Sequence, residues 1–146
     1  MNVAELCTRR AIVVPMSATL TEVAQLMGDE HVGAVVVTAA GGSSPHVAGI
    51  ITDRDIVRAQ LERTADLSRL SAGATMTRNP LVLDEHESIE GAIAHLRARG
   101  VRRAPVTAAD GRPIGLVSVD DLLVHLATSL VGAATIVAQQ PRAERR

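Results

Sequence analysis

The chain contains no phenylalanine, tyrosine or tryptophan among its 146 residues. It therefore lacks the aromatic rings on which single-stranded nucleic acids usually stack. Its 15 basic and 16 acidic residues leave a formal net charge of −1, so no overall basic field attracts nucleic acid either. Both absences argue against a nucleic-acid partner.

Cysteine occurs once, as Cys7, which excludes an internal disulfide and is consistent with a reducing compartment. The amino terminus lacks the basic stretch and long apolar core of a signal peptide. No apolar run approaches the roughly 20 residues that a membrane-spanning helix needs. With 47% apolar and 21% charged residues, the composition predicts a soluble globular domain without a membrane partner, located in the cytoplasm.

One pattern of about 60 residues occurs twice in the chain. Residues Ala11–Thr38 align without a gap on Pro80–Thr107, at a spacing of 69 positions. Further on the spacing falls to 66, and Gly49–Asp55 aligns on Gly115–Asp121. The three extra residues of the first copy lie in the turn segment Gly41–Pro45. The chain is therefore predicted to be built from two equivalent units.

Each copy has the periodicity of strand, helix, strand, strand and helix. In the first copy we predict a strand at 12–14, a helix from Thr19, strands at 32–37 and 47–51, and a helix from Thr52 or Asp53. In the second we predict a strand at 81–83, a helix from Ser88, strands at 101–106 and 114–117, and a helix from Asp120. Glu22, three residues after Thr19, completes a capping box at the first helix. About 60 residues bury too little surface alone, so the two units are expected to share their stability.

The predicted organisation has four parts: a first motif at 4–63, a connection at 64–75, a second motif at 76–130 and an extension at 131–146. The connection is expected to be polar. Within the extension, Leu130–Val137 is apolar enough to continue the last helix against a partner, and 139–146 is typical of a solvated tail.

Several segments together resemble the tandem CBS-domain family, named for cystathionine β-synthase. They are Gly49–Ile56, Gly115–Asp121, Met76–Pro80 and Gly100–Val106. The resemblance implies an α/β (α+β) fold in which two β-α-β-β-α motifs pack sheet to sheet with pseudo-two-fold symmetry, as a Bateman module. It also implies adenosine-containing ligands bound in clefts between the motifs, and a homodimer shaped as a flat disk.

The closing segment of each motif suits such a ligand. A strand that runs directly into a helix at Thr52 leaves free backbone N–H groups for a phosphate. The Thr52 hydroxyl can donate to phosphate, and Asp55, one turn later, can accept from ribose hydroxyls. Ser118 and Asp121 repeat the spacing. The alternative is that both pairs only cap their helices.

The resemblance also implies which residues line each cleft. The residues of cleft A are Thr52, Asp55, Met76, Leu81, Val101, Arg102 and Arg103. The residues of cleft B are Ser118, Asp121, Ile12, His31, Val32 and Gly33. Cleft A is expected to be the more basic and to bind the more highly charged ligand. Phosphate in cleft B would need Arg9, Arg10 or a protonated His31.

The arginine pair has a second interpretation, because Arg102 and Arg103 could be surface residues that pair with an acid such as Asp120. Consecutive strand residues point opposite ways, so at most one of the two is expected to enter a given cleft. The acidic segment Asp84–Glu87, with His95 downstream, is interpreted as a helix entrance rather than a metal site. Cys7 is expected to serve in packing.

No phosphate-binding glycine loop or paired nucleophile and base is present, so no catalytic activity is expected. The leading hypothesis is a regulatory sensor of AMP, ADP or ATP, with NAD and S-adenosylmethionine as further candidates, that signals to an unidentified effector protein. One alternative is an interaction scaffold with vestigial clefts that works through its dimer faces. Another is a small nucleotide-processing enzyme with Asp53 or Asp120 as the base.

Overall fold

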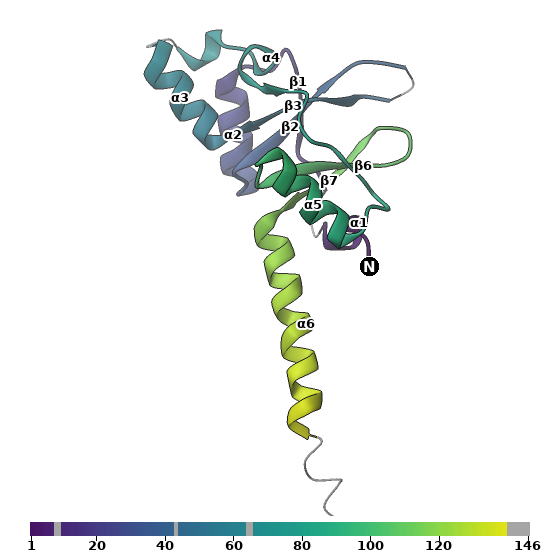
Figure 1. The fold of residues 1–146 in the computed structure, drawn as a ribbon. Coiled ribbons are helices and arrows are strands. Elements are labelled where there is room, and N and C mark those ends of the chain that lie inside the picture. The colour runs from purple at the N-terminus through teal and green to yellow at the C-terminus, as the bar shows by residue number, and fades with distance from the viewer. Residues whose placement is uncertain (8–9, 43, 64–65, 140–146) are drawn as a thin grey trace, which may run out of the picture.

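The computed structural model describes residues 1–7, 10–42, 44–63 and 66–139, which form two β-sheets with helices packed on each (Figure 1). The first half contains α1 (Val3–Leu6), β1 (Val13–Pro15), α2 (Leu20–Glu30), β2 (Ala34–Ala39), β3 (His46–Thr52) and α3 (Asp53–Arg63). The second half contains η1 (Leu67–Arg69), α4 (Ala72–Thr75), β4 (Thr77–Arg78), β5 (Leu83–Asp84), α5 (Ile89–Arg99), β6 (Arg103–Thr107), β7 (Pro113–Ser118) and α6 (Val119–Gln139).

The two sheets repeat one topology. In the first, with strand order β1-β2-β3-β4, β1 is parallel to β2 and the other neighbours are antiparallel. In the second, with order β5-β6-β7, β5 is parallel to β6 and β7 is antiparallel to it. Helices α2 and α5 provide the crossovers that parallel pairing requires. The predicted β-α-β-β-α order is confirmed in both copies.

Each sheet has its own hydrophobic core. In β2, Val35 and Val37 face α2 and α3 in the first core. The alternate residues of the strand, Ala34 and Val36, are also buried. They point to the opposite face, because strand side chains alternate. That face meets the second sheet, whose Arg103 and Leu116 line a cavity together with Ala34. The sheets therefore pack against each other, as the repeat predicts.

Two short helices, α1 and α4, each pack on the core of the other repeat. Helix α1 lies at the start of the first repeat, yet Val3 is fully buried in the second core. Helix α4 leads into the second repeat, yet Ala72 is fully buried in the first core. Backbone hydrogen bonds fix both positions, from Val3 N to Glu87 O at 2.9 Å and from Ala72 N to Ala18 O at 2.7 Å. Each repeat thus completes the core of the other.

This exchange corrects the expectation of a polar connection between the repeats. Leu67 and Leu70 pack against the first core, and Ala72 belongs to it. The sequence pattern did not predict this because the buried residues are few and separated by polar side chains. Small residues at Ala72 and Gly73 allow α4 to approach the chain closely at Met16, whose carbonyl oxygen accepts from Gly73 N at 2.9 Å.

Four strands begin later than predicted: β1 at Val13, β5 at Leu83, β2 at Ala34 and β6 at Arg103. For β2 and β6 the cause lies at the end of the preceding helix. Helix α2 ends at Glu30 and α5 at Arg99. Their C-cap residues, His31 and Gly100, adopt the left-handed conformation, with φ of 54° and 63°. That conformation turns the chain out of the helix, so the next two residues form a loop before the strand begins. The predicted strands at 32–37 and 101–106 are observed as β2 and β6, which start at Ala34 and Arg103.

Helix α6 confirms the predicted continuation of the last helix through Leu130–Val137, but its apolar character departs from expectation. It begins at Val119, one residue before the predicted position, and runs for 21 residues to Gln139, away from the sheets (Figure 1). An 18-residue window of it has a mean hydropathy of 1.7, and only 6% of that window is buried. By length and composition alone it could cross a membrane, so the expectation that no such segment exists was wrong. Scattered Ser, Thr and His residues hid the pattern, since they interrupt the apolar run without adding formal charge.

Candidate functional site

The first turn of α3 is closed by a reciprocal pair of side chains. Asp55 Oδ2 accepts from Thr52 N at 2.8 Å and from Thr52 Oγ1 at 3.0 Å. Thr52 Oγ1 in turn accepts from Asp55 N at 3.3 Å. This is a capping box with aspartate in place of glutamate, so the helix-capping interpretation holds for this pair.

Helix α6 begins in the same way. Asp121 Oδ2 accepts from Ser118 N at 2.8 Å and from Ser118 Oγ at 2.6 Å, while Asp121 N donates to Ser118 Oγ at 3.2 Å. The cap uses one oxygen of the carboxylate. The other, Oδ1, has no hydrogen-bond partner among the described residues, so capping and ligand binding are compatible at Asp121.

A cavity of about 350 Å³ lies beside Ser118 and Asp121. It is lined by all six residues predicted for cleft B, namely Ile12, His31, Val32, Gly33, Ser118 and Asp121. It is also lined by Arg10, Ala34, Arg103, Leu116 and Asp120. The volume lies within the range of about 300–1,000 Å³ found for small-molecule sites. The tertiary structure therefore brings the two halves of cleft B together.

Cleft A is assembled less completely. A cavity of about 460 Å³ is lined by Thr52, Val101, Arg102 and Arg103 of the predicted set. Asp55 instead lines a separate hollow of about 150 Å³, although its side chain accepts a hydrogen bond from Thr52. The other two predicted residues lie in the cores. Met76 is buried in the first and Leu81 packs against the second.

The chain at Met76 and Thr77 approaches β3 closely at Gly49. Gly49 of β3 pairs with Arg78 of β4. A Cβ at position 49 would lie 2.5 Å from Met76 Sδ and 2.7 Å from Thr77 O. Only glycine leaves room for both atoms, which explains why the segment Gly49–Ile56 begins with glycine.

Arg102 and Arg103 both line cleft A. The expectation that at most one of the two side chains enters a given cleft was therefore wrong. Arg102 precedes β6 and is therefore not bound by strand alternation. It reaches Asp120 Oδ1 with Nη2 at 3.4 Å, an exposed pair that contributes little to stability. Arg103 is half-buried between the sheets, where it lines both clefts.

The two clefts adjoin, because Arg103, Ser118 and Asp120 line both. Cleft A has three arginines and two aspartates, namely Arg54, Arg102, Arg103, Asp53 and Asp120. Cleft B has two arginines and two aspartates, namely Arg10, Arg103, Asp120 and Asp121. The excess of positive charge in cleft A is thus a single arginine.

Some lining residues were not predicted. Ile50 lines cleft A and Leu116 lines cleft B, and the two are equivalent in the repeat, 66 positions apart. Arg54 and Asp120 are equivalent by the same spacing. These lining residues could therefore have been predicted from the alignment of the repeats. The position of Arg103 in both clefts could not, because it depends on how the sheets pack.

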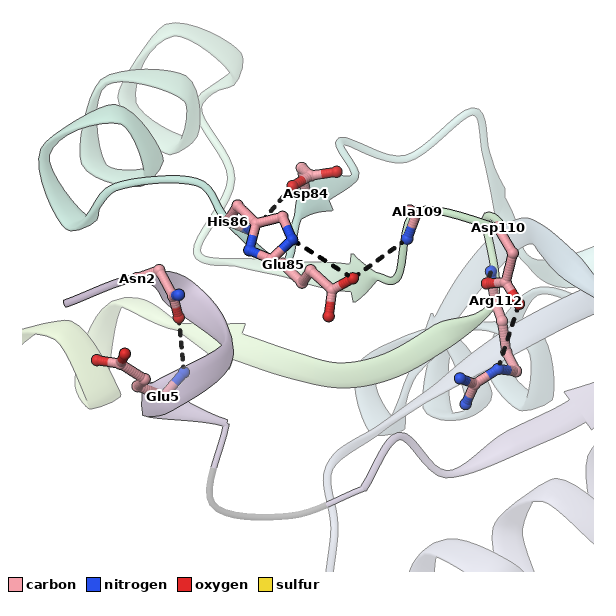
Figure 2. A network of polar contacts seen from close by, with 8 residues as sticks. All are labelled: Asn2, Glu5, Asp84, Glu85, His86, Ala109, Asp110 and Arg112. Carbon is pink, nitrogen blue, oxygen red and sulfur yellow. Dashed lines mark hydrogen bonds and ion pairs between the residues drawn. The ribbon is translucent and has the colours of Figure 1, made fainter.

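The acidic segment Asp84–Glu87 forms turn and helix-entrance contacts, and Figure 2 shows those of Asp84, Glu85 and His86. Asp84 Oδ1 accepts from His86 N at 2.8 Å, and Glu85 Oε1 accepts from Ala109 N at 3.3 Å. His95 Nδ1 lies 3.7 Å from Glu87 Oε2. Across the part of the chain that the structure describes, no three His, Cys, Asp or Glu side chains gather as a metal site would require.

Cys7 packs against the second core, in the position that Met76 occupies in the first. Burial raises the pKa of the Cys7 thiol above its ordinary value of 9.0, and the negative charge of Asp121 adds to the effect. A raised pKa disfavours the reactive thiolate, as expected of a packing residue.

The family model for the CBS domain matches the chain twice, at residues 3–62 and 70–128. The chain belongs to the CBS-domain family, and its pair of motifs packs as a CBS pair.

Known relatives and structures support this assignment. Hypoxic response protein 1 of Mycobacterium tuberculosis is 32% identical over 108 residues, which cover 74% of this chain and 73% of the relative. A crystal structure of Hypoxic Response Protein I with two coordinated zinc ions covers 86% of this chain and 98% of its own, with 28% identity and a TM-score of 0.72. A CBS domain protein from Pyrobaculum aerophilum complexed with AMP covers 88% and 99%, with 27% identity and a TM-score of 0.73.

Proposed function

We propose that this chain is a regulatory CBS pair that binds an adenine nucleotide between its two sheets, with cleft B as a binding site. One observation carries the proposal. The six residues that the family resemblance implied for cleft B come from both repeats, and all of them line one cavity of about 350 Å³. The AMP complex of the relative from Pyrobaculum aerophilum supports an adenine nucleotide as the ligand class.

The chemistry of cleft B fits each part of such a ligand. Asp121 Oδ1 can accept hydrogen bonds from ribose hydroxyls, because only Oδ2 is used by the cap. Arg10 and Arg103 provide cations for phosphate. Ile12 and Val32 offer aliphatic walls for the base, which must take the place of aromatic rings in this chain.

Cleft A is proposed as the site for the more highly phosphorylated nucleotide, because its lining includes one more arginine. Since the clefts share Arg103, occupancy of one would alter the charge available to the other. A regulatory output further requires that the nucleotide bind two conformations with different affinity. The effector that receives the signal is a protein, and we propose no catalytic step.

The testing experiment is calorimetric titration of nucleotide-free protein with AMP, ADP, ATP, NAD and S-adenosylmethionine. Asp121→Asn preserves the shape of the cap but removes the charge that assists ribose binding. We expect a loss of about 1.5–3 kcal/mol of binding free energy, which is a factor of roughly ten to more than a hundred in affinity. Asp55→Asn is the matched control, because it makes the same change in the equivalent cap.

A second variant fills cleft B without altering its polar groups. A Cβ at Gly33 would make ordinary contacts, 3.4 Å from Asp53 Oδ2 and 3.8 Å from Arg103 Nη1. Gly33→Leu is therefore expected to fold and to block the cleft. Undiminished nucleotide binding in Gly33→Leu and Asp121→Asn would overturn cleft B as the site.

One observation favours a second function, that of an interaction scaffold. The exposed apolar side chains of α6, such as Leu123 and Leu130, provide a surface that needs no ligand. Folded protein that binds none of the five ligands would support the scaffold over the sensor.

A further inference from the structure

A third cavity, which we call cavity C, lies between strand β1 and the start of β7. Its volume is about 490 Å³, larger than that of either cleft. Val14 points into the first core, so its neighbour Val13 points to the opposite side of β1, where it lines cavity C. Pro113 and Ile114 of β7 line the cavity as well. Both repeats therefore contribute to it, as they do to clefts A and B.

The walls of cavity C are mainly apolar. Ala11, Val13 and Ile114 provide aliphatic surface, and the rings of Pro45 and Pro113 add rigid wall. Val13 remains 46% exposed, so a ligand with an apolar body would remove aliphatic surface from water there. A hydrogen bond from Ala11 N to Ile114 O at 3.2 Å joins the two repeats along this wall. The cavity is therefore formed by the fold itself.

Of the described residues that line cavity C, two are arginines and none is acidic. Arg112 pairs with Asp110, which lies outside the lining, from Nε to Oδ2 at 3.7 Å (Figure 2). Both side chains are about half exposed, so this pair is weak, and it leaves Nη1 and Nη2 of the guanidinium available for an anion. Within the part of the chain that the structure describes, Arg10 has no ion-pair partner.

The two arginines are not part of the internal repeat. Arg10 corresponds to Asn79 at the spacing of 69 positions, and Arg112 corresponds to His46 at the spacing of 66. Neither counterpart is an arginine, although the two repeats share one strand topology. The fold therefore does not require a permanent positive charge at either position, and the two charges are a property of cavity C.

We propose that cavity C binds an organic anion with an apolar body, such as a medium-chain carboxylate. The aliphatic walls cover the body, and Arg10 and Arg112 hold the acidic group by charge-assisted hydrogen bonds. The volume lies within the range of about 300–1,000 Å³ found for small-molecule sites. No described residue of the lining offers a carboxylate for ribose hydroxyls, as Asp121 does in cleft B, so a nucleotide is a poor occupant.

Cavity C is coupled to cleft B, because Arg10 lines both. An anion in cavity C engages the guanidinium that would otherwise serve a phosphate in cleft B. Each ligand should therefore lower the affinity for the other, and by the same factor. This coupling rests on the proposed nucleotide site, whereas anion binding in cavity C does not.

The test is calorimetric titration of the nucleotide-free full chain with three probes. Hexanoate carries both the charge and the apolar body, inorganic phosphate carries only the charge, and 1-hexanol carries only the body. We expect saturable binding of hexanoate at least about tenfold tighter than that of either other probe. Hexanoate that binds no more tightly than inorganic phosphate would overturn the proposal.

Two variants locate the binding site. Arg112→Gln removes a charge from cavity C alone, so hexanoate affinity should fall at least about tenfold while AMP affinity stays within about twofold. Arg99→Gln is the matched control, because Arg99 is an exposed arginine at the end of α5 that lines neither cleft nor cavity C. Equal losses of hexanoate affinity in the two variants would overturn cavity C as the site.

The coupling is measured by repeating the AMP titration with cavity C saturated by hexanoate. We expect weaker AMP binding in the wild-type chain and no such effect in Arg10→Gln, which lacks the shared cation. AMP affinity that hexanoate leaves unchanged would refute the coupling. Absence of AMP binding, with hexanoate still bound, would refute the proposed nucleotide site and leave cavity C in place.

Discussion

Asp55 and Asp121 occupy equivalent positions and make the same cap, yet only Asp121 lines its predicted cleft. The hydrogen bonds that each carboxylate makes are local, formed with a residue three positions earlier. Whether its second oxygen faces a cavity depends on the side chains that the other repeat brings opposite. At the scale of single residues, identical motifs therefore acquire different surroundings.

Gly49 shows how one residue fixes the distance between two strands. Gly49→Ala is expected to destabilise the protein by about 1–3 kcal/mol, because the added methyl group would lie 2.7 Å from the Thr77 carbonyl oxygen, which is backbone. The measurement is urea denaturation monitored by circular dichroism.

Gly28→Ala serves as the control for that substitution. Gly28 lies in α2, and a Cβ there would have no atom within 4 Å. Alanine should stabilise the helix by up to about 1 kcal/mol. Equal effects of the two substitutions would show that the close approach at Gly49 does not limit the fold.

The elements that join the repeats are the short ones. Helices α1 and α4 have four residues each, too few to be stable alone, and each is held by the core of the repeat to which it does not belong. Helix α6, by contrast, has 21 residues, of which only Leu122 is buried.

Val3→Ala tests the exchanged position of α1. Val3 is completely buried in the second core, so removing two methyl groups should lower the free energy of unfolding by about 1–3 kcal/mol. The matched control is Val131→Ala, at an exposed position of α6, which should change stability by less than about 0.5 kcal/mol. Chemical denaturation of both variants makes the comparison, and an unaltered midpoint in Val3→Ala would exclude the packing of α1.

At the scale of the molecule, the two cores are tied together twice. Val3 connects the amino terminus to the second core, and Ala72 connects the second half to the first. The clefts exist only while the sheets are packed, because residues from both sheets line each one.

We therefore expect the two repeats to unfold as one cooperative unit. Val23→Ala weakens the first core and Val3→Ala the second, and each should shift the same single transition. Circular dichroism and hydrogen exchange of both repeats, followed together in urea, would check this. Two separated transitions, each sensitive to one substitution, would contradict it.

The sequence alone determined the repeat, the order of the strands and long helices, and the pairs Thr52–Asp55 and Ser118–Asp121. These features depend on local periodicity and on residues three or four positions apart, which a sequence displays directly. The capping box at Thr19 was predictable for the same reason, and the structure confirms it. The residues gathered in cleft B followed from the family resemblance.

The tertiary structure decided which half of the chain completes which core. It placed α1 and α4 across the repeats, set Arg103 between the two clefts, and packed Met76 into the first core and Leu81 against the second. None of these contacts has a sequence period, because each joins residues that are far apart in the chain. Burial of a few small side chains and the packing of two sheets fixed them, and those are properties of the folded chain alone.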